Sequence, residues 1–209
     1  METERLRIFD EQYNEIGSLP RKEVHKQGHW HETFHCWFVR RENNQTFLTL
    51  QLRSKMKKDF PNLLDITAAG HLLDTESVQD GVREIEEEIG IKVNMTDLIP
   101  VGRIKNELIF NQFIDREFCH VYLYVTTLEN EQFTLQEEEV CGMFQARLED
   151  LKALYKEKTS EIKVNGFTVG EDGSRSEGVI AVRKESFVPH GKTYMQTLFK
   201  AVEALSFED

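Results

Sequence analysis

Cysteine and proline are scarce in this chain of 209 residues, which has 3 of the former and 4 of the latter. Cys36, Cys119 and Cys141 are odd in number, show no metal-ligand spacing and sit among apolar residues. Because disulfides persist in oxidising compartments, we expect three buried free thiols and a cytoplasmic protein. The hydrophobic content of 39% and only 12 glycines exclude a low-complexity or collagen-like chain.

Excess positive charge and long apolar runs are also missing. Lys and Arg number 26 against 37 for Asp and Glu, a net charge of −11, and such a chain repels the phosphates of a nucleic acid polymer. No stretch approaches the roughly 18 apolar residues of a membrane span, and residues 1–5 lack the apolar core of a signal peptide. A small site made of carboxylates and a divalent cation stays compatible with this charge.

What the chain does have is regular patterning along its length. The length is about one and a half times that of a usual domain, so we expect a single domain over residues 1–209. Runs of β-forming residues predict strands at 6–9, 22–25, 34–41, 47–52, 98–104, 118–126, 162–169 and 178–182. Helical periodicity predicts helices at 78–89, 148–158 and 195–205, while residues 59–75 look irregular. The expected class is α/β, with helices layered on a mixed sheet.

The clearest of these elements is the helix at 78–89. Ser77 and Asp80 have the spacing of a capping box at its start, and Gly90 tolerates the left-handed backbone that ends a helix. A glycine at position 81 inside the helix costs about 1 kcal/mol relative to alanine, which indicates close packing there. The apolar stripe recurs at helical spacing and consists of Val78, Val82, Ile85 and Ile89.

Three glutamates share one face of this helix. Glu84, Glu87 and Glu88 stand at i, i+3 and i+4, where like charges repel one another. A solvated acidic face is one explanation, because such faces are common in acidic chains. A divalent cation is the other, since Mg²⁺ or Mn²⁺ takes several carboxylate oxygens, often shared with substrate phosphates.

The residues around the helix favour the cation, because residues 70–91 resemble the signature box of the Nudix hydrolases. That box is a Gly, five residues, a Glu, seven residues, and then Arg-Glu-apolar-x-Glu-Glu-x-Gly-apolar. One departure is that six residues, not seven, separate the first Glu from the Arg, and we place the deletion where the loop enters the helix. The matching positions are Gly70, Glu76, Arg83, Glu84, Ile85, Glu87, Glu88, Gly90 and Ile91.

The resemblance implies a Nudix α/β/α sandwich with the box as a loop–helix–loop, extended by N-terminal strands (about 1–30) and C-terminal additions (about 160–209). It also implies Mg²⁺- or Mn²⁺-dependent hydrolysis of a nucleoside diphosphate derivative. By position, Glu87 and Glu88 would be the main metal ligands and Glu84 a further ligand or a base, with the Gly70 carbonyl completing the shell. Arg83 would orient a neighbouring glutamate, and Glu76 would be structural.

Outside the box the chain resembles the isopentenyl diphosphate isomerase branch of the same superfamily, over most of residues 20–125. In that branch an Arg and a Lys contact the diphosphate, and they match Arg53 and Lys57. The branch also binds a metal, and the matching positions here are His25, His31, His71, Asp115 and Glu117. The isomerase needs a Cys where this chain has Ala69, and alanine cannot move a proton to or from carbon. The missing acid/base group therefore argues against isomerase activity.

For several polar residues, the sequence leaves two possible roles open. His31 and His71 either line the pocket and bind substrate or hold a metal, and His29 and His35 would share a strand face with His31. Glu117 is a candidate extra ligand or general base. The acidic run at 137–139 looks solvated. Pocket-mouth candidates are His190 and Lys192, and the aromatic residues that we expect in the core rather than stacked on a base are Tyr155, Phe167, Tyr194 and Phe199.

The sequence therefore predicts a Mg²⁺- or Mn²⁺-dependent hydrolase of a small diphosphate, with a homodimer as the default oligomer. Two alternatives are an isopentenyl diphosphate isomerase-type enzyme and a Nudix module that binds a nucleotide without cleaving it. Intact Glu84, Glu87 and Glu88 argue against the second alternative. The box does not identify the substrate, because specificity lies in loops outside it.

Overall fold

The computed structural model describes residues 4–110 and 113–206, so residues 1–3 of the acidic N-terminus lie outside it. Its strands join into one 11-stranded sheet whose main path runs β11-β10-β9-β4-β3-β1-β2. The strands are β1 (Arg5–Phe9), β2 (Glu15–Pro20), β3 (Trp30–Glu42), β4 (Gln45–Arg53), β5 (Leu64–Asp65), β6 (Ala68–His71), β7 (Ile99–Phe110), β8 (Phe113–Val125), β9 (Val140–Arg147), β10 (Ile162–Val169) and β11 (Arg175–Val182).

Strand β3 is the centre of the sheet. It pairs with β1, β4, β6 and β8, and its pairing with β8 is parallel, whereas the other strand pairs of the described chain are antiparallel. Its residues 31–39 are all buried, as expected for a strand covered on both faces. Because successive side chains point to opposite faces, β3 contributes to two separate cores.

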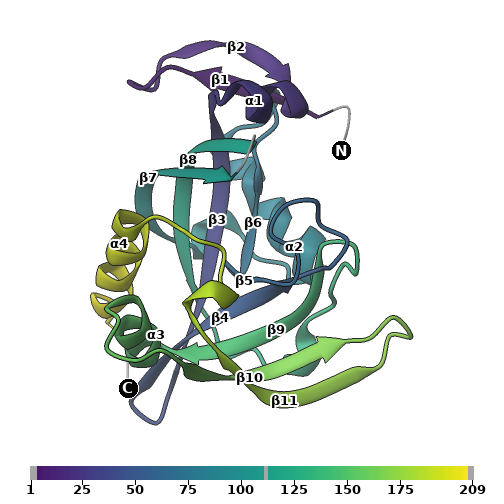
Figure 1. Cartoon of the computed structure of the whole chain (residues 1–209), viewed down its shortest axis with the longest axis vertical. Coiled ribbons are helices and arrows are strands. Elements are labelled where there is room, and N and C mark those ends of the chain that lie inside the picture. The colour runs from purple at the N-terminus through teal and green to yellow at the C-terminus, as the bar shows by residue number, and fades with distance from the viewer. Residues whose placement is uncertain (1–3, 111–112, 207–209) are drawn as a thin grey trace.

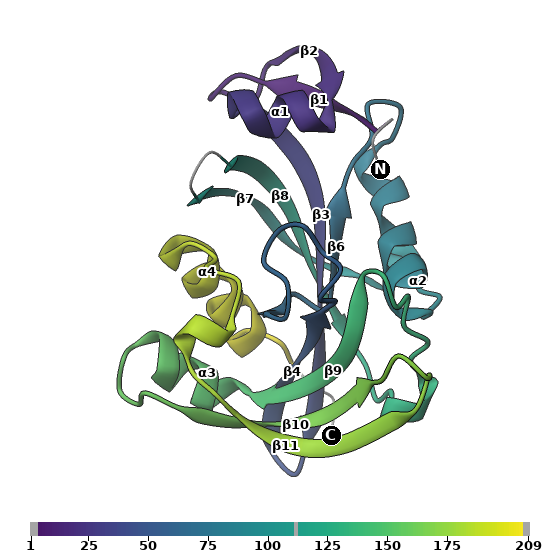
Figure 2. The same ribbon diagram turned by 45° about the vertical axis from the view of Figure 1, so that its right-hand side comes forward.

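Helices cover both faces of the sheet. Phe34 and Phe38 of β3 pack with Ile85 and Ile89 on one face, and Trp37 packs with the helices of the other face. In Figures 1 and 2, α3 and α4 lie on the side of the sheet away from α2. The α-helices of the described chain are α1 (Arg21–Gln27), α2 (Arg83–Ile89), α3 (Leu148–Tyr155) and α4 (Lys192–Glu203). The layered arrangement expected from the sequence is confirmed.

The predicted helix at 78–89 is confirmed but has two parts. A 3₁₀ helix spans Val78–Val82, and α2 continues it to Gly90, whose φ of 73° is left-handed. The capping box of Ser77 and Asp80 is present. The 3₁₀ segment lies where the box is one residue short, and its tighter winding advances about 2.0 Å per residue against 1.5 Å. Fewer residues therefore span the same entry.

Some predicted elements were wrong or missed. Residues 22–25 belong to the helix α1, which begins after Pro20 and ends at Gly28, whose φ of 70° suits a helix C-terminus. Strands β2, β5, β6 and β9 were not predicted, and residues 59–75, expected to be irregular, contain β5 and β6. Glycine, proline and cysteine interrupt the β-forming patterns of β2, β6 and β9, and β5 has only two residues. All three cysteines are free, but Cys141 is only partly buried.

Gly81 explains how closely the Nudix-like helix approaches the sheet. A Cβ at this position would stand 2.6 Å from Cβ of Phe34 and 2.9 Å from Cδ2 of Leu72. Real Cβ atoms do not approach so near, so any larger residue must displace β3 or the helix. The close packing expected from the sequence is confirmed.

We expect Gly81→Ala to lower the free energy of unfolding by about 1–3 kcal/mol, because the added methyl overpacks this contact. Gly178→Ala is the matched control, since a Cβ at Gly178 on the edge strand β11 meets nothing within 4 Å. Urea unfolding of both variants and the wild type measures the difference. Equal stability of the two variants would contradict the role given to the Phe34 contact.

Candidate active site

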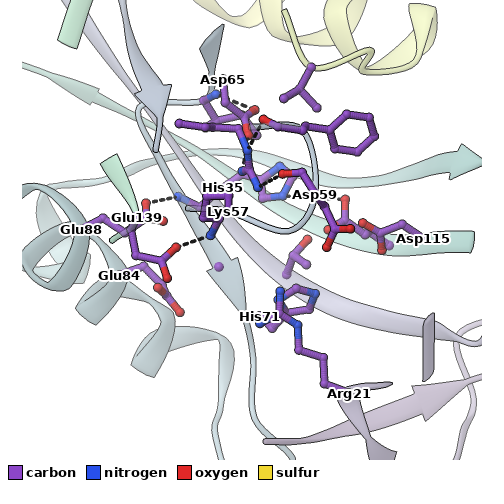
Figure 3. Close-up of a pocket in the computed structure, with 18 of the residues that line it drawn as sticks. Arg21, His35, Lys57, Asp59, Asp65, His71, Glu84, Glu88, Asp115 and Glu139 are labelled. Atoms are coloured by element: carbon purple, nitrogen blue, oxygen red, sulfur yellow. Dashed lines mark hydrogen bonds and ion pairs between the residues drawn. The ribbon is translucent and has the colours of Figure 1, made fainter. Parts of the chain in front are cut away.

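A cavity of about 490 Å³ lies beside α2, and it collects side chains from α1, β3, β6, β8 and the segment before α4. Figure 3 shows Glu84, Glu88 and Glu139 on one side of it and Asp115 on the opposite side. Of the residues predicted for the site, His31 and Glu76 are not among those that line the cavity. Those that do line it are Arg53, Lys57, Gly70, His71, Arg83, Glu84, Glu87, Glu88 and Glu117.

Two box carboxylates are held against β6. Glu88 is buried, and its Oε2 accepts hydrogen bonds from the Ala69 backbone N–H at 3.0 Å and from Nε2 of Gln51 at 3.2 Å. Glu84 lies directly over Gly70, where an added Cβ would stand 2.1 Å from the Glu84 carboxyl carbon. Glycine is therefore the residue that lets a carboxylate approach the β6 backbone so closely.

Arg83 ties the box together. It donates from Nε and Nη2 to the two oxygens of Glu76, at 2.6 and 2.9 Å, and from Nη1 to Glu84 at 2.7 Å and Glu87 at 2.9 Å. Glu76 also accepts from the Leu73 backbone N–H at 2.8 Å. One guanidinium therefore joins Glu76, which is bound to the loop backbone, to Glu84 and Glu87 on the helix.

The buried carboxylates are electrostatically unfavourable as anions. Burial raises the pKa of Glu84 to about 7, despite the nearby Arg83 guanidinium. Burial, with repulsion from Glu84, raises the pKa of Glu88 to about 8. A divalent cation would offset both effects, because it supplies positive charge to oxygen ligands that it prefers. The donor set of this helix face therefore fits Mg²⁺ or Mn²⁺.

A second cluster combines three histidines with an aspartate. Asp115 Oδ1 lies 3.3 Å from Nε2 of His31 and 3.6 Å from Nε2 of His25, and Nε2 of His71 lies 3.3 Å from that of His25. The four ligand atoms all fall within 4.8 Å of one another. In a tetrahedral site with bonds of about 2.1 Å, neighbouring ligand atoms stand about 3.4 Å apart.

The polar atoms of this cluster also fit a metal. Nε2 of His31 and Oδ1 of Asp115 are buried, and neither has a hydrogen-bond partner of good geometry within the described residues. Burial lowers the pKa of His25 to about 4 and that of His71 well below its usual value, which keeps both rings neutral, whereas Asp115 raises the pKa of His31 despite the burial of that ring. Neutral imidazoles and an ionised carboxylate are what a divalent transition metal binds.

Glu117 comes from β8 and lines the same cavity as the α2 carboxylates. It shares a buried group with His35 and Cys119, in which the Cys119 thiol donates to Glu117 Oε2 at 3.6 Å. Asn106 Nδ2 donates to the same oxygen at 3.4 Å. Burial and repulsion from Asp115 raise the pKa of Glu117 to about 7.

The predicted phosphate-binding cations are already engaged by the protein. Arg53 donates to Asp65 at 2.9 Å and to two loop carbonyls, those of Asp59 and Phe60. Lys57 forms an ion pair with Glu139. Glu139 was expected in a solvated run, yet this pairing draws it into the cavity wall.

The cavity wall also contains residues that the sequence did not indicate. Arg21 and Asp65 line the cavity, and no local motif marks them. His190 lines it as expected, whereas Lys192 does not. The aromatic residues Phe167, Tyr194 and Phe199 are buried in the core, as predicted, and Tyr155 is partly buried.

The NUDIX domain family model matches residues 29–164, well over half of the chain. The chain belongs to the Nudix family. It is 43% identical to an uncharacterized Nudix hydrolase of Clostridium acetobutylicum, over 97% of this chain and 98% of that protein. It is also 41% identical to Nudix hydrolase 3 of Arabidopsis thaliana, over 60% of this chain but only 17% of that protein.

The isomerases are more distant Nudix relatives. An isopentenyl-diphosphate Delta-isomerase of Photorhabdus laumondii is 26% identical over 59% of this chain and 69% of its own length. A solved structure from Deinococcus radiodurans has a TM-score of 0.55 at 20% identity, covering 72% of this chain and 87% of that one, which confirms the Nudix fold. No helix in residues 4–110 and 113–206 is long and apolar enough to cross a membrane.

The raised pKa of Glu88 makes the stability of the metal-free protein depend on pH. Between its usual value of 4.5 and about 8, the folded chain keeps a proton that the unfolded chain has released. This carboxyl therefore lowers the free energy of unfolding as pH rises through that range. Glutamine cannot ionise, so the Glu88→Gln variant avoids this loss. We expect its free energy of unfolding, relative to that of the wild type, to increase by on the order of 2 kcal/mol between pH 6 and pH 8.5.

Urea unfolding in the presence of EDTA at both pH values measures this gain. Glu86→Gln is the control, because Glu86 is exposed on the same helix and pairs with Lys92. A Glu88→Gln difference from wild type that stays constant with pH, as for Glu86→Gln, would show that Glu88 is already ionised without metal.

Proposed function

We propose that this protein is a Mg²⁺- or Mn²⁺-dependent hydrolase that cleaves a diphosphate bond of a nucleoside diphosphate derivative or related small molecule. The arrangement of Glu84 and Glu88 over Gly70 and Ala69 supports this proposal most directly. Two like charges are buried side by side there, which costs stability unless a cation joins them. Membership of the Nudix family supports the same class of reaction.

Glu84, Glu87 and Glu88, with the Gly70 carbonyl, are the groups that we expect to hold the cation. When bound, Mg²⁺ or Mn²⁺ neutralises charge on phosphoryl oxygens and makes a nearby water more acidic. Arg83 holds Glu84 and Glu87 in place through its hydrogen bonds. Glu84 is our choice for the group that takes the proton of the attacking water, because Arg83 and the close contact with Gly70 hold its carboxylate at the proposed cation site.

The rest of the wall suits a diphosphate. Arg21 and Lys57 line the cavity and bring positive charge to its wall, beside Arg53 and Arg83. Lys57 would have to exchange Glu139 for a phosphate oxygen, whereas the hydrogen bonds of Arg53 assign it to holding the loop before β5. We therefore place Lys57, rather than Arg53, next to the substrate.

We expect Glu88→Gln and Glu84→Gln each to lower kcat about a hundredfold or more, since a metal's charge stabilisation is worth several kcal/mol. The assay is phosphate-containing product release from a panel of diphosphates with Mg²⁺ or Mn²⁺: nucleoside diphosphates, sugar nucleotides, ADP-ribose, dinucleotides and isopentenyl diphosphate. Glu86→Gln is the matched control and should keep wild-type activity.

The outcomes separate the alternatives. Metal-dependent hydrolysis that survives in Glu86→Gln but not in Glu88→Gln supports the hydrolase. Tight binding of a nucleotide with no turnover supports a binding module. Double-bond migration in isopentenyl diphosphate without phosphate release would support an isomerase despite Ala69.

We also propose that His25, His31, His71 and Asp115 hold a second divalent metal. The convergence of three ring nitrogens on one carboxylate oxygen supports this assignment. His31 is fully buried and does not line the cavity, so a role as metal ligand suits it better than direct contact with substrate. His71 lines the cavity and would place that metal at its wall.

His71→Ala should remove about one equivalent of tightly bound transition metal from protein purified without chelator, because one of four ligands is lost. Metal content by mass spectrometry is the measurement. His120→Gln is the control, since His120 also bonds a carboxylate, Glu32 at 2.8 Å, but does not line the cavity. Equal metal content in the two variants would rule out His71 as a ligand.

The remaining expectations concern the whole chain. We propose one Nudix domain over residues 1–209, in which N-terminal strands and C-terminal additions extend the matched region 29–164. A cytoplasmic homodimer stays our default, and the partner of the site is a small molecule rather than a nucleic acid polymer or a membrane.

A further inference from the structure

A polar group on the sheet face opposite α2 has no part in the hydrolysis described above. It consists of His35 on β3, Glu117 on β8 and Tyr194 on α4, and both His35 and Glu117 line the cavity. His35 pairs in register with Ala69 of β6, whose backbone N–H is bonded to Glu88. The group therefore lies next to the box carboxylates rather than at a distant surface.

The hydrogen bonds around Tyr194 fix the tautomer of His35. The Tyr194 hydroxyl lies 3.0 Å from Nε1 of Trp37, which can only donate, and 2.9 Å from Nδ1 of His35. The hydroxyl accepts from Trp37 and has no other hydrogen-bond partner than His35 among the described residues, so we assign its own hydrogen to Nδ1 of His35. The hydrogen of a neutral His35 ring is then on Nε2.

His35 is also kept neutral. Burial, together with the neighbouring His190, lowers the pKa of His35 to about 3. The ring is thus a fixed donor at Nε2 and not a cation. Nε2 lies 4.0 Å from Oε2 of Glu117, which is longer than a hydrogen bond. An oxygen atom between the two can stand about 2.8 Å from both, accepting from His35 and donating to Glu117.

Tyr194, which contacts His35 directly, is itself held in place by a chain of three further residues. Tyr194 is fully buried and stacks on the ring of His190, with centroids 5.0 Å apart. His190 Nε2 lies 2.7 Å from Asp65 Oδ1, and Asp65 is itself bonded to Arg53. Arg53, Asp65 and His190 thus form a chain of contacts that ends on Tyr194, so they act as positioning residues for His35.

We propose that His35 and Glu117 bind a hydroxyl group on the non-phosphate part of the substrate, and that they select hydroxyl-bearing diphosphates over hydrocarbon ones. A hydroxyl is the group that both accepts from a fixed N–H and donates to a carboxyl oxygen. A hydrocarbon chain at this position would leave the N–H of His35 without an acceptor, which is costly in a buried site, whereas Glu117 would keep its contacts with Asn106 and Cys119. This inference rests on the proposed hydrolase function and names its substrate class.

The test compares kcat/KM for two kinds of diphosphate with Mg²⁺. ADP-ribose and UDP-glucose carry hydroxyls on the sugars of their non-phosphate parts, whereas ethyl diphosphate and isopentenyl diphosphate carry none. We expect the wild-type kcat/KM for the better of the two hydroxyl-bearing compounds to be at least about tenfold higher than that for the compounds without hydroxyls. His35→Leu should reduce this preference roughly tenfold, and His35→Gln, whose amide can still donate, should restore part of it.

Tyr194→Phe provides a second, independent variant. It removes the hydroxyl that fixes the tautomer, so the nitrogen resonances of His35 should change from the Nε2-protonated pattern to a mixture, and the preference should fall. Tyr155→Phe is the matched control, since Tyr155 packs against the same core as Tyr194 but does not line the cavity. His120→Gln is the control for the His35 variants, because it changes another histidine near a carboxylate, one on β8 that does not line the cavity, and it should keep the wild-type preference.

The results distinguish this inference from the function on which it rests. No metal-dependent hydrolysis of any compound overturns both. Two outcomes overturn the hydroxyl site alone, provided that hydrolysis occurs and is lost in Glu88→Gln. In the first, the wild type shows no preference for hydroxyl-bearing compounds. In the second, His35→Leu lowers kcat/KM equally for both kinds of compound. A preference that falls in His35→Leu and Tyr194→Phe and not in the controls supports it.

Discussion

The burial of two carboxylates against the β6 backbone is the constraint on which the rest of the site depends. Glu84 can lie over Gly70 only because that residue has no side chain, and Glu88 reaches the Ala69 N–H only because α2 approaches the sheet closely. Gly81 permits that approach by leaving room for Phe34. Three local features, two glycines and a short 3₁₀ entry, therefore serve one electrostatic arrangement.

That arrangement is unfavourable for the protein alone. Both acids keep protons at pH values where exposed glutamates are charged. Stability is thus reduced at the place where we propose that the chemistry occurs, as is common for functional sites. Arg83 limits the cost, because one guanidinium serves Glu76, Glu84 and Glu87 at once.

The sequence predicted the parts of the fold whose signals are local. The helix of the box could be read from its cap, its apolar stripe and Gly90, and the central strands from their β-rich runs. Strand β6 could not be found, because Ala68, Gly70 and His71 have no β-forming character and pair with β3 only in the folded chain. The N-terminal helix α1 was misread because seven residues give too short a period to distinguish a helix from a strand.

The same distinction applies to the site. Glu84, Glu87 and Glu88 share one helix, so their spacing placed them on one face and the resemblance to the Nudix box made that face a candidate site. His25, His31, His71 and Asp115 come from four elements and became candidates through family resemblance. Glu139 looked solvated in its acidic run, and only the position of Lys57 across the cavity shows otherwise. Asp65 and His190 are 125 residues apart, so no local pattern could have joined them.

The position of His25 has a consequence for how the molecule is held together. His25 belongs to α1, which with β1 and β2 forms an N-terminal unit that extends beyond the main sheet (Figure 2). The strand contacts of this unit with the rest of the described chain include one register pair, Phe9 with Trp30, and one isolated bridge, Leu6 with Leu73. The other three members of the histidine cluster lie on β3, β6 and β8. A metal in that cluster would therefore join the N-terminal unit to the three strands, and it would also hold in place the helix that carries Arg21, a residue of the cavity wall.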